Sequence, residues 1–210
     1  MKIKICGMRD DENIRAVSEL RPDYMGFVFY PRSPRFAAAL NAALLQGLDC
    51  SIRRVGVFVD AGLELMEATV QKHSLHAIQL HGTETPDLCR AVAKRMAGIE
   101  IIKAFAVGPS FRFVDAAPFE ECCARFLFDA AARAAGGSGT AFDWTRLDEY
   151  QGKTPFFLSG GIGADNIKAA VKAASEHPRG YGIDVNSRVE TSPGVKALAL
   201  VRQVISEVRA

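Results

Sequence analysis

The amino-acid sequence predicts an α/β fold in which eight parallel strands close into a (β/α)8 barrel, the TIM barrel. Eight short apolar runs recur along the 210 residues, and helical patterns separate most of them. Such alternation is typical of a parallel sheet with helices packed on its faces. Each strand-plus-helix unit takes about 26 residues, which is compact beside the roughly 250 residues of a typical complete barrel.

The predicted strands are runs of four to six mostly apolar residues, the length and composition expected of buried parallel strands. In chain order they are Lys2–Cys6, Tyr24–Phe29, Arg54–Val59, Ala77–Leu80, Glu100–Ala104, Arg125–Asp129, Phe156–Ser159 and Tyr181–Val185.

The predicted helices carry apolar residues three and four positions apart, and several begin with Asp, which suits a first helical turn. They include Asp11–Leu20, Leu63–His73, Asp87–Met96, Asp165–Ser175 and Gly194–Val208, the last with Val195, Leu198, Val201 and Ile205 in register. Between Ala104 and Arg125, prolines and scattered phenylalanines replace a clear helical pattern. The fifth βα unit is therefore predicted to be irregular.

An open, doubly wound sheet is the alternative architecture, but eight units of similar length favour closure. No linker and no shift in composition divides the chain. Residues 1–210 are therefore predicted to form a single (β/α)8-barrel domain.

Composition and charge exclude several classes of function. The formal net charge is only +2, with acidic and basic residues interspersed, so we expect no nucleic-acid partner and no anionic membrane surface. The start of the chain carries charges within its apolar run, unlike a signal peptide, and no stretch approaches the roughly 18 apolar residues of a membrane span. The five cysteines are odd in number and lack C-x-x-C spacing, which predicts a reducing cytoplasm, no disulfide framework and no metal site.

A candidate reaction site lies where the Arg125–Asp129 run ends in a carboxylate. A glycine-rich segment, Gly136-Gly137-Ser138-Gly139, follows it. Barrels place their reaction sites at the carboxyl ends of the strands, and glycines let backbone N–H groups approach a ligand closely. Asp129 is therefore the first candidate for chemistry.

The first strand supplies a second candidate. Side chains alternate along a strand, so Lys2, Lys4 and Cys6 share one face, and Ile3 and Ile5 share the other. Cys6 would then lie at the end of the strand, on the same rim as Asp129. It is either an inert buried thiol or a base whose pKa is lowered by nearby cations such as Lys4.

Motifs recur along the chain from end to end, each at or just after a predicted strand end. They are Lys4-Ile5-Cys6-Gly7-Met8, Gly26-Phe27-Val28-Phe29-Tyr30-Pro31-Arg32-Ser33-Pro34-Arg35, Val55-Gly56-Val57-Phe58-Val59, Gln79-Leu80-His81-Gly82, Leu127-Phe128-Asp129, Gly136-Gly137-Ser138-Gly139 with Phe142-Asp143-Trp144, Leu158-Ser159-Gly160-Gly161, and Gly182-Ile183-Asp184-Val185-Asn186-Ser187 with Val189-Glu190. In these motifs and their order, the sequence resembles the phosphoribosylanthranilate isomerase family of tryptophan biosynthesis.

The resemblance implies a (β/α)8 barrel, with an irregular fifth unit, that performs an Amadori rearrangement of N-(5-phosphoribosyl)anthranilate. The product would be 1-(2-carboxyphenylamino)-1-deoxyribulose 5-phosphate, formed without a metal or an organic cofactor. By the same resemblance, Asp129 is the general acid that opens the ribose ring, and Cys6 is the base that removes the C2 proton. Each positioned acid or base contributes roughly 10²–10⁴-fold to a rate.

The resemblance and the residue chemistry also suggest the groups that bind substrate. Gly160 and Gly161 precede a predicted helix, and helix N-termini with glycine loops bind phosphate. Asn186 and Ser187 would complete that site. The other candidates are Arg35, or secondarily Arg32, for the anthranilate carboxylate, Asp184 for the ribose hydroxyls or the amine, and His81 as a residue that lines the site.

Two positions depart from the family pattern: Arg188 stands where a small residue is more usual, and Arg9 stands where threonine is more usual.

The rival enzymes are related phosphosugar isomerase barrels, including the histidine-pathway isomerase, whose acid and base are both aspartates. The rival of another class is a barrel that binds a phosphosugar without catalysis. The sequence leaves the choice between monomer and homodimer open.

Overall fold

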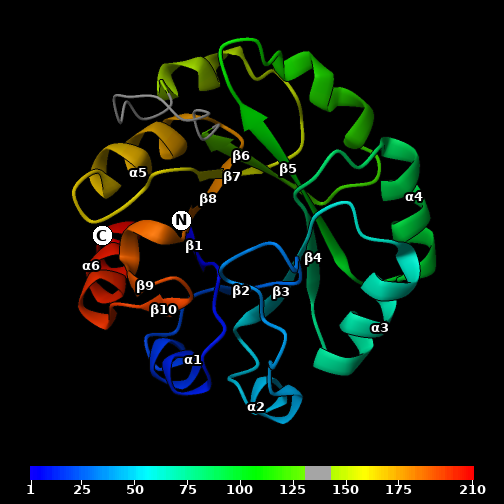
Figure 1. Ribbon diagram of the computed structural model, residues 1–210. Coiled ribbons are helices and arrows are strands. Elements are labelled where there is room, and N and C mark those ends of the chain that lie inside the picture. The colour runs from blue at the N-terminus through cyan, green and yellow to red at the C-terminus, as the bar shows by residue number, and fades with distance from the viewer. Residues whose placement is uncertain (131–142) are drawn as a thin grey trace.

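The computed structural model describes residues 1–130 and 143–210, and it shows eight parallel strands closed into a barrel with helices outside it (Figure 1). The strands follow one another around the barrel in chain order, and the last pairs with the first, with Lys4 opposite Asp184. Their bounds are β1 (Lys2–Ile5), β2 (Tyr24–Val28), β3 (Arg53–Phe58), β4 (Ala77–Leu80), β5 (Glu100–Val107), β6 (Arg125–Ala130), β7 (Phe156–Ser159) and β8 (Gly180–Val185).

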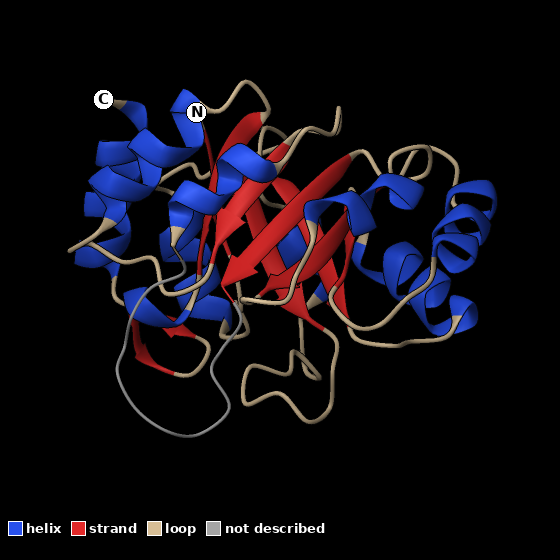
Figure 2. Ribbon diagram, turned by 90° about the horizontal axis from the view of Figure 1, so that it is seen from above, coloured by secondary structure: helices blue, strands red, loops and turns tan. Residues whose placement is uncertain are grey.

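The helices form the outer layer, and Figure 2 shows them flanking the strands on both sides. The α-helices are α1 (Asp11–Ser18), α2 (Ala42–Gln46), α3 (Leu63–His73), α4 (Pro86–Arg95), α5 (Ile167–Glu176) and α6 (Leu198–Arg209), and the 3₁₀ helices are η1 (Phe113–Phe119), η2 (Trp144–Glu149) and η3 (Ser187–Val189). A short antiparallel ribbon, β9 (Glu190–Ser192) with β10 (Val195–Lys196), precedes α6. None of the described helices combines the length and the apolar character that a bilayer span requires.

The eight predicted strands are confirmed, with ends that shift by up to three residues. The irregular fifth unit is also confirmed: η1 replaces an α-helix between β5 and β6, and Pro118 lies inside it. Proline lacks the N–H that an α-helical ladder needs, so a short 3₁₀ segment is the available alternative. The predicted C-terminal helix is confirmed as α6, but its predicted start at Gly194 was wrong, because Gly194 has a φ of +88° and Val195 belongs to β10.

The alternation of side chains along the strands divides the core into two layers. One face of the strands fills the barrel, where Tyr24, Val55, Ile102, Leu127 and Phe157 pack together. The other face packs against the helices and includes Ile3 and Ile5, as the first strand predicts. Lys4 and Cys6 therefore point inward, and the polar face of β1 ends at the mouth of the barrel.

A fully buried ion pair joins β5 to the segment after β4. The Nζ of Lys103 lies 2.8 Å from Glu84 Oε2, and both side chains are almost fully shielded from solvent. Glu84 also accepts hydrogen bonds from the backbone N–H groups of Asp60 and Gly82. One carboxylate thus holds together the loops that follow β3 and β4.

Replacing Glu84 by alanine is expected to lower the free energy of unfolding by about 3–5 kcal/mol, because the change leaves the Lys103 ammonium buried and unpaired. Urea denaturation measures this quantity. The matched control is Glu176→Ala, which removes an exposed pair with Lys172 and should change the free energy of unfolding by less than about 1 kcal/mol. Equal losses in the two variants would contradict the prediction.

Candidate active site

The carboxyl ends of all eight strands meet at one end of the barrel, because the strands are parallel and closed. Cys6 follows β1, His81 follows β4, Asp129 lies near the end of β6, and Asp184 lies near the end of β8. Four of the residues predicted for the site are therefore brought to one mouth. β6 and β1 are separated by β7 and β8, so Asp129 and Cys6 stand on well-separated parts of the rim.

Asp129 lies beside His81, so a direct contact joins two residues that the sequence placed 48 positions apart. The Nε2 of His81 is 3.2 Å from Asp129 Oδ2, and the two side chains are 35% and 27% exposed. The other ring nitrogen of His81 lies 2.7 Å from Gln79 Nε2. Gln79 thus orients the imidazole, and the imidazole orients the carboxylate, while both keep access to the mouth.

Cys6 lies deeper, packed against Val28 and Val57 in a small apolar cluster. Its place depends on Gly26 in the neighbouring strand: a Cβ at that position would lie 2.7 Å from the Cys6 sulfur and 3.2 Å from its Cα. Such distances are shorter than van der Waals contact, so a side chain at Gly26 would displace the thiol. Gly7, which follows Cys6, has a φ of +77° that favours glycine.

The expectation that cations lower the pKa of Cys6 is wrong for this structure. Burial raises the pKa of the thiol, and the nearby Asp184 carboxylate raises it further. Lys4 and Lys196 act in the opposite direction, but they do not outweigh the loss of solvation. Because a buried thiolate loses its hydration, Cys6 is held mainly as a thiol in the ligand-free protein.

Asp184 pairs with Lys4 inside the barrel. The Nζ of Lys4 lies 2.8 Å from Asp184 Oδ1, and the lysine is fully buried. The second carboxylate oxygen accepts a hydrogen bond of 3.1 Å from Ser159 Oγ. Asp184 holds the pKa of Lys4 up, to about 12, against the effect of burial, so this lysine stays charged next to Cys6.

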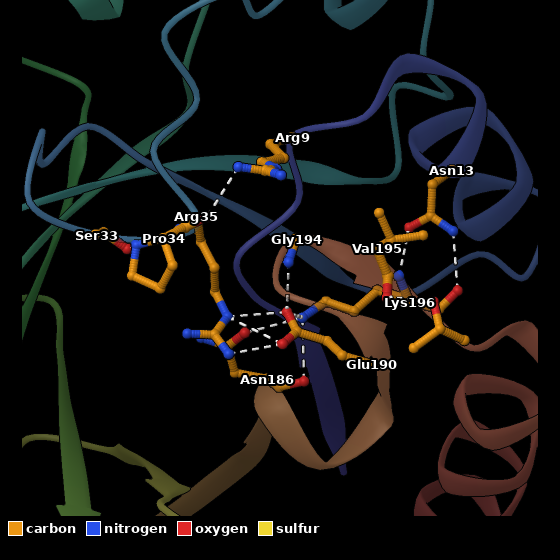
Figure 3. Close-up of polar contacts among 11 residues, drawn as sticks. Arg9, Asn13, Ser33, Pro34, Arg35, Asn186, Glu190, Gly194, Val195 and Lys196 are labelled. Carbon is orange, nitrogen blue, oxygen red and sulfur yellow. Dashed lines mark hydrogen bonds and ion pairs between the residues drawn. The ribbon is translucent and has the colours of Figure 1, made fainter.

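Arg35 makes a bidentate ion pair with Glu190 rather than standing alone. Its Nε lies 2.9 Å from one carboxylate oxygen of Glu190, and its Nη2 lies 2.6 Å from the other. Figure 3 shows the Glu190 carboxylate between Arg35 and Lys196. The remaining guanidinium nitrogen, Nη1, donates no hydrogen bond within the described part of the chain. The pair fixes the guanidinium and leaves it one free donor edge.

The two other arginines near this loop lie differently. Arg32 is exposed. Arg9 donates a hydrogen bond of 2.8 Å to the carbonyl of Pro34, so it joins the loop after β1 to the loop after β2. The departure from the family pattern at position 9 thus has a structural role next to Arg35.

The glycine pair after β7 has a left-handed backbone that favours glycine. Gly160 and Gly161 have φ values of +92° and +63°, and no atom lies within 4 Å of where a Cβ of Gly161 would be. The loop leads into the N-terminus of α5. Arg188 reaches across to it, with 3.1 Å from Nη1 to the Gly161 carbonyl and 2.7 Å from Nη2 to Asp165. Arg188 therefore ties the segment after β8 to this loop, and its charge is paired with that of Asp165.

Asn186 and Ser187 follow β8 on the neighbouring side of the mouth. The carbonyl and side-chain oxygens of Asn186 both accept hydrogen bonds from Lys196, at 3.1 and 2.8 Å, and Ser187 is exposed. The glycine-rich segment Gly136–Gly139 lies outside the described residues.

Sequence reasoning assigned no role to several residues that support the site. Glu190 and Lys196 hold Arg35 and Asn186, and Gln79 and Ser159 hold His81 and Asp184. The alternation of side chains along β4 and β7 could have indicated Gln79 and Ser159, because each lies near the end of its strand on the face that points into the barrel. Lys196 carried no such signal, because it follows a glycine turn that the pattern assigned to a helix.

The structure also brings together three cysteines that spacing did not connect. The sulfurs of Cys89, Cys122 and Cys123 all lie within 4.8 Å of one another. They belong to the layer around α4 and the segment after η1, and none of them is among the residues of the mouth.

Comparison with known proteins gives consistent results. Residues 3–207 match the sequence profile of N-(5'phosphoribosyl)anthranilate (PRA) isomerase. The N-(5'-phosphoribosyl)anthranilate isomerase of Phocaeicola vulgatus is 40% identical over 209 residues, which cover 100% of this chain and 98% of the relative. The solved phosphoribosyl anthranilate isomerase of Thermotoga maritima superposes with a TM-score of 0.84 at 32% identity, covering 100% and 98% of the two chains.

A second solved phosphoribosyl anthranilate isomerase, in complex with reduced 1-(o-carboxyphenylamino)-1-deoxyribulose 5-phosphate, superposes with a TM-score of 0.82 at 31% identity and the same coverage. The match of sequence profile, relatives and fold extends over essentially the whole chain. The chain therefore belongs to the N-(5'-phosphoribosyl)anthranilate isomerase family.

Proposed function

We propose that this chain isomerises N-(5'-phosphoribosyl)anthranilate to 1-(2-carboxyphenylamino)-1-deoxyribulose 5-phosphate, as an enzyme of tryptophan biosynthesis. The observation that carries the proposal is the placement of Asp129 and Cys6 on separate parts of one barrel mouth, each held by a defined neighbour. An Amadori rearrangement needs an acid at the ring oxygen and a base at C2. Family membership supplies the substrate that fits these two groups.

Asp129 acts as the general acid in the first step. It transfers a proton to the ribose ring oxygen as the C1–O bond breaks, and the anilinic nitrogen supplies its electron pair to form the Schiff base. His81 lies 3.2 Å from the carboxylate and holds it in place for this transfer. A proton for the next turnover reaches Asp129 from solvent, since both side chains are partly exposed.

Cys6 acts as the base in the second step. Its thiolate removes the C2 proton of the Schiff base, and the C–H electrons form the C1–C2 double bond of an enolamine. The positive charge on the Schiff-base nitrogen is neutralised at the same time. Lys4 stabilises the thiolate before the transfer, and the enolamine then tautomerises to the ketone. The acid and the base of this scheme are both side chains of the described part of the chain, and the scheme requires no metal or organic cofactor.

The loops at the mouth offer donors to the two anionic ends of the substrate, the anthranilate carboxylate and the phosphate. The free Nη1 edge of Arg35, and secondarily Arg32, can donate to the anthranilate carboxylate. The backbone of Gly160 and Gly161, with Asn186 and Ser187, offers donors to the phosphate next to the N-terminus of α5. Between them, Asp184, which is paired with Lys4, would orient the ribose hydroxyls or the substrate amine.

Turnover of freshly generated N-(5'-phosphoribosyl)anthranilate, followed as loss of its fluorescence, tests the proposal. The purified chain should consume the substrate and form the aminoketose, identified by chromatography. Absence of turnover, with tight binding of the reduced product analogue, would instead make the chain a phosphosugar-binding barrel.

Replacing Arg35 by alanine is expected to raise KM by about tenfold or more and to change kcat less, because a charge-assisted hydrogen bond to the anthranilate carboxylate is lost. Steady-state kinetics measure both constants. Lys72→Ala, at an exposed position of α3, is the matched control and should leave KM unchanged. Equal effects on KM would remove Arg35 from the binding site.

The rate of Schiff-base decay in single-turnover measurements, which reports removal of the C2 proton, should rise with pH from neutral into the alkaline range. Ring opening needs Asp129 with its proton, so this step is followed separately from it. The base must be a thiolate, and burial raises the pKa of Cys6, so the active form is lost as pH falls below that raised pKa. The charged groups facing the thiol are Lys4, Asp184, Lys196 and Arg35. A pH profile that stays flat through neutral and alkaline pH would contradict the role of a buried thiolate.

Several broader predictions belong to this proposal. Residues 1–210 act as one catalytic domain, the reaction takes place in the cytoplasm, and the partner is a small molecule. A solved structure from Thermotoga maritima describes monomers generated from a dimeric isomerase of this family. Whether this chain is a monomer or a homodimer is decided by sedimentation equilibrium.

A further inference from the structure

Three cysteines form a sulfur cluster outside the barrel mouth. Cys89 lies in the first half of α4, and Cys122 and Cys123 lie between η1 and β6. Cys89 is fully buried, Cys123 is nearly so, and Cys122 is half-buried. We call Cys89, Cys122 and Cys123 the three-thiol cluster. The irregular fifth unit creates it, because η1 ends beside α4 and directs two successive residues toward that helix.

The distances within the cluster are compatible with a metal ion held by all three sulfurs. The three sulfurs lie within 4.8 Å of one another. A cation bound at about 2.3 Å by three sulfurs places them about 4 Å apart. Movements of less than about 1 Å would therefore bring all three sulfurs to bonding distance, and Cys122 gives the ion a route from solvent.

The ligand set indicates which cation the cluster takes. Soft thiolates select copper(I), zinc and iron–sulfur clusters over hard, oxygen-preferring ions. Structural zinc is almost always four-coordinate, and among the described residues the one group of three or more possible ligands has these three cysteines and no fourth member. Glu84 is near enough to act on Cys89, but its carboxylate is paired with Lys103 at 2.8 Å and is not grouped with the three sulfurs.

We propose that the three-thiol cluster binds one copper(I) ion through the sulfurs of Cys89, Cys122 and Cys123. Binding forms the copper–sulfur bonds, and the thiol protons that these bonds replace pass to the buffer, with no change in oxidation state. The ion cross-links α4 to the segment after η1. It therefore stabilises the folded chain, since the unfolded chain does not hold the three sulfurs together.

Anaerobic titration with copper(I), kept reduced by ascorbate and buffered by bicinchoninate, tests this site. We expect the wild type and Cys50→Ser, which changes an exposed thiol, to withdraw one equivalent from the chelator. Cys89→Ser and the milder Cys122→Ser should each bind about tenfold more weakly or worse. Circular dichroism verifies that both variants are folded, and copper should raise the Tm of the wild type more than that of either variant.

Two results would overturn the proposal. One is that the wild type leaves all copper on the chelator. The other is that folded Cys122→Ser withdraws copper as strongly as the wild type, which would place the binding at another thiol.

A second inference concerns Lys196 and rests on the proposed function. Lys196 is fully buried, and its ammonium lies 2.7 Å from Glu190 Oε1 and 2.8 Å from Asn186 Oδ1 (Figure 3). Glu190 in turn holds Arg35. One lysine is thus connected to the loop that would bind phosphate and to the arginine that would bind the anthranilate carboxylate.

The charges of this network are unbalanced in a way that suits an anionic ligand. Lys196 and Arg35 carry two positive charges, and the single carboxylate between them, Glu190, carries one negative charge. Burial lowers the pKa of Lys196, and Glu190 opposes this effect. The excess positive charge beside the mouth is complemented when the anthranilate carboxylate arrives.

We infer that Lys196 is a positioning residue for substrate binding. It holds the loop after β8 through Asn186, and it holds Arg35 through Glu190. Removing its ammonium while keeping a chain of similar length should free Asn186 and let Glu190 draw Arg35 out of position. Both ends of the substrate would then bind more weakly, whereas Asp129 and His81, which lie on other strands, would be unaffected.

Kinetics of Lys196→Met, with Lys153→Met as the control at an exposed position, test this role. We expect KM to rise about tenfold or more and the pH profile to move toward alkaline pH, because one of the cations facing Cys6 is gone while Lys4, Asp184 and Arg35 remain. A lowered Tm with unchanged KM and pH profile would reduce Lys196 to a structural role. An inactive wild type would instead contradict the proposed function.

Discussion

Replacing Asp129 by asparagine should lower kcat by about 10²–10⁴-fold, the contribution typical of a positioned general acid. An amide cannot supply the proton that the ring oxygen needs as the C1–O bond breaks. The side chain keeps its size, and it can still accept a hydrogen bond from His81, which lies 3.2 Å from the carboxylate. The fold and the binding of the product analogue should therefore persist.

The matched control for this variant is Asp148→Asn, which changes an exposed carboxylate in η2. Its kcat should equal that of the wild type. Retention of full activity by Asp129→Asn would transfer the role of the acid to another group, of which His81 is the nearest.

Replacing Cys6 by alanine is expected to reduce kcat by a similar factor, about 10²–10⁴-fold, because alanine cannot accept the C2 proton. The thiol lies in an apolar cluster with Val28 and Val57, so alanine leaves only a small cavity and the protein should fold. Single-turnover measurements of Schiff-base decay would isolate this step from ring opening.

Cys50→Ala provides the control, since Cys50 is exposed and remote from any candidate role. The rise of the Schiff-base decay rate with pH should also disappear in Cys6→Ala, because the titrating base has been removed. A residual activity with the same alkaline rise would show that another group titrates.

The sequence predicted the barrel well because its strands are buried on both faces and its helices are amphipathic. Those patterns are local, so all eight strands could be located from the order of apolar and polar residues along the chain. Helix α2 was not predicted, since it has only five residues, and the start of α6 was misplaced by the β9–β10 ribbon. A short turn of irregular backbone leaves little periodic signal.

The sequence could predict which residues reach the mouth, because locating a strand also locates the residue at its carboxyl end. The state of those residues was not predictable. The raised pKa of Cys6 follows from three-dimensional burial, and the pairing of Arg35 with Glu190 joins residues 155 positions apart. Such contacts arise from closure of the barrel, which no local pattern encodes.

The most direct test of the account combines turnover with binding in three proteins: the wild type, Asp129→Asn and Cys6→Ala. Turnover of N-(5'-phosphoribosyl)anthranilate is measured by fluorescence, and binding of the reduced product analogue is measured by calorimetry. The account predicts that all three proteins bind the analogue and that only the wild type turns the substrate over at full rate. A variant that binds normally and retains the wild-type kcat would contradict the assignment of acid and base at the barrel mouth.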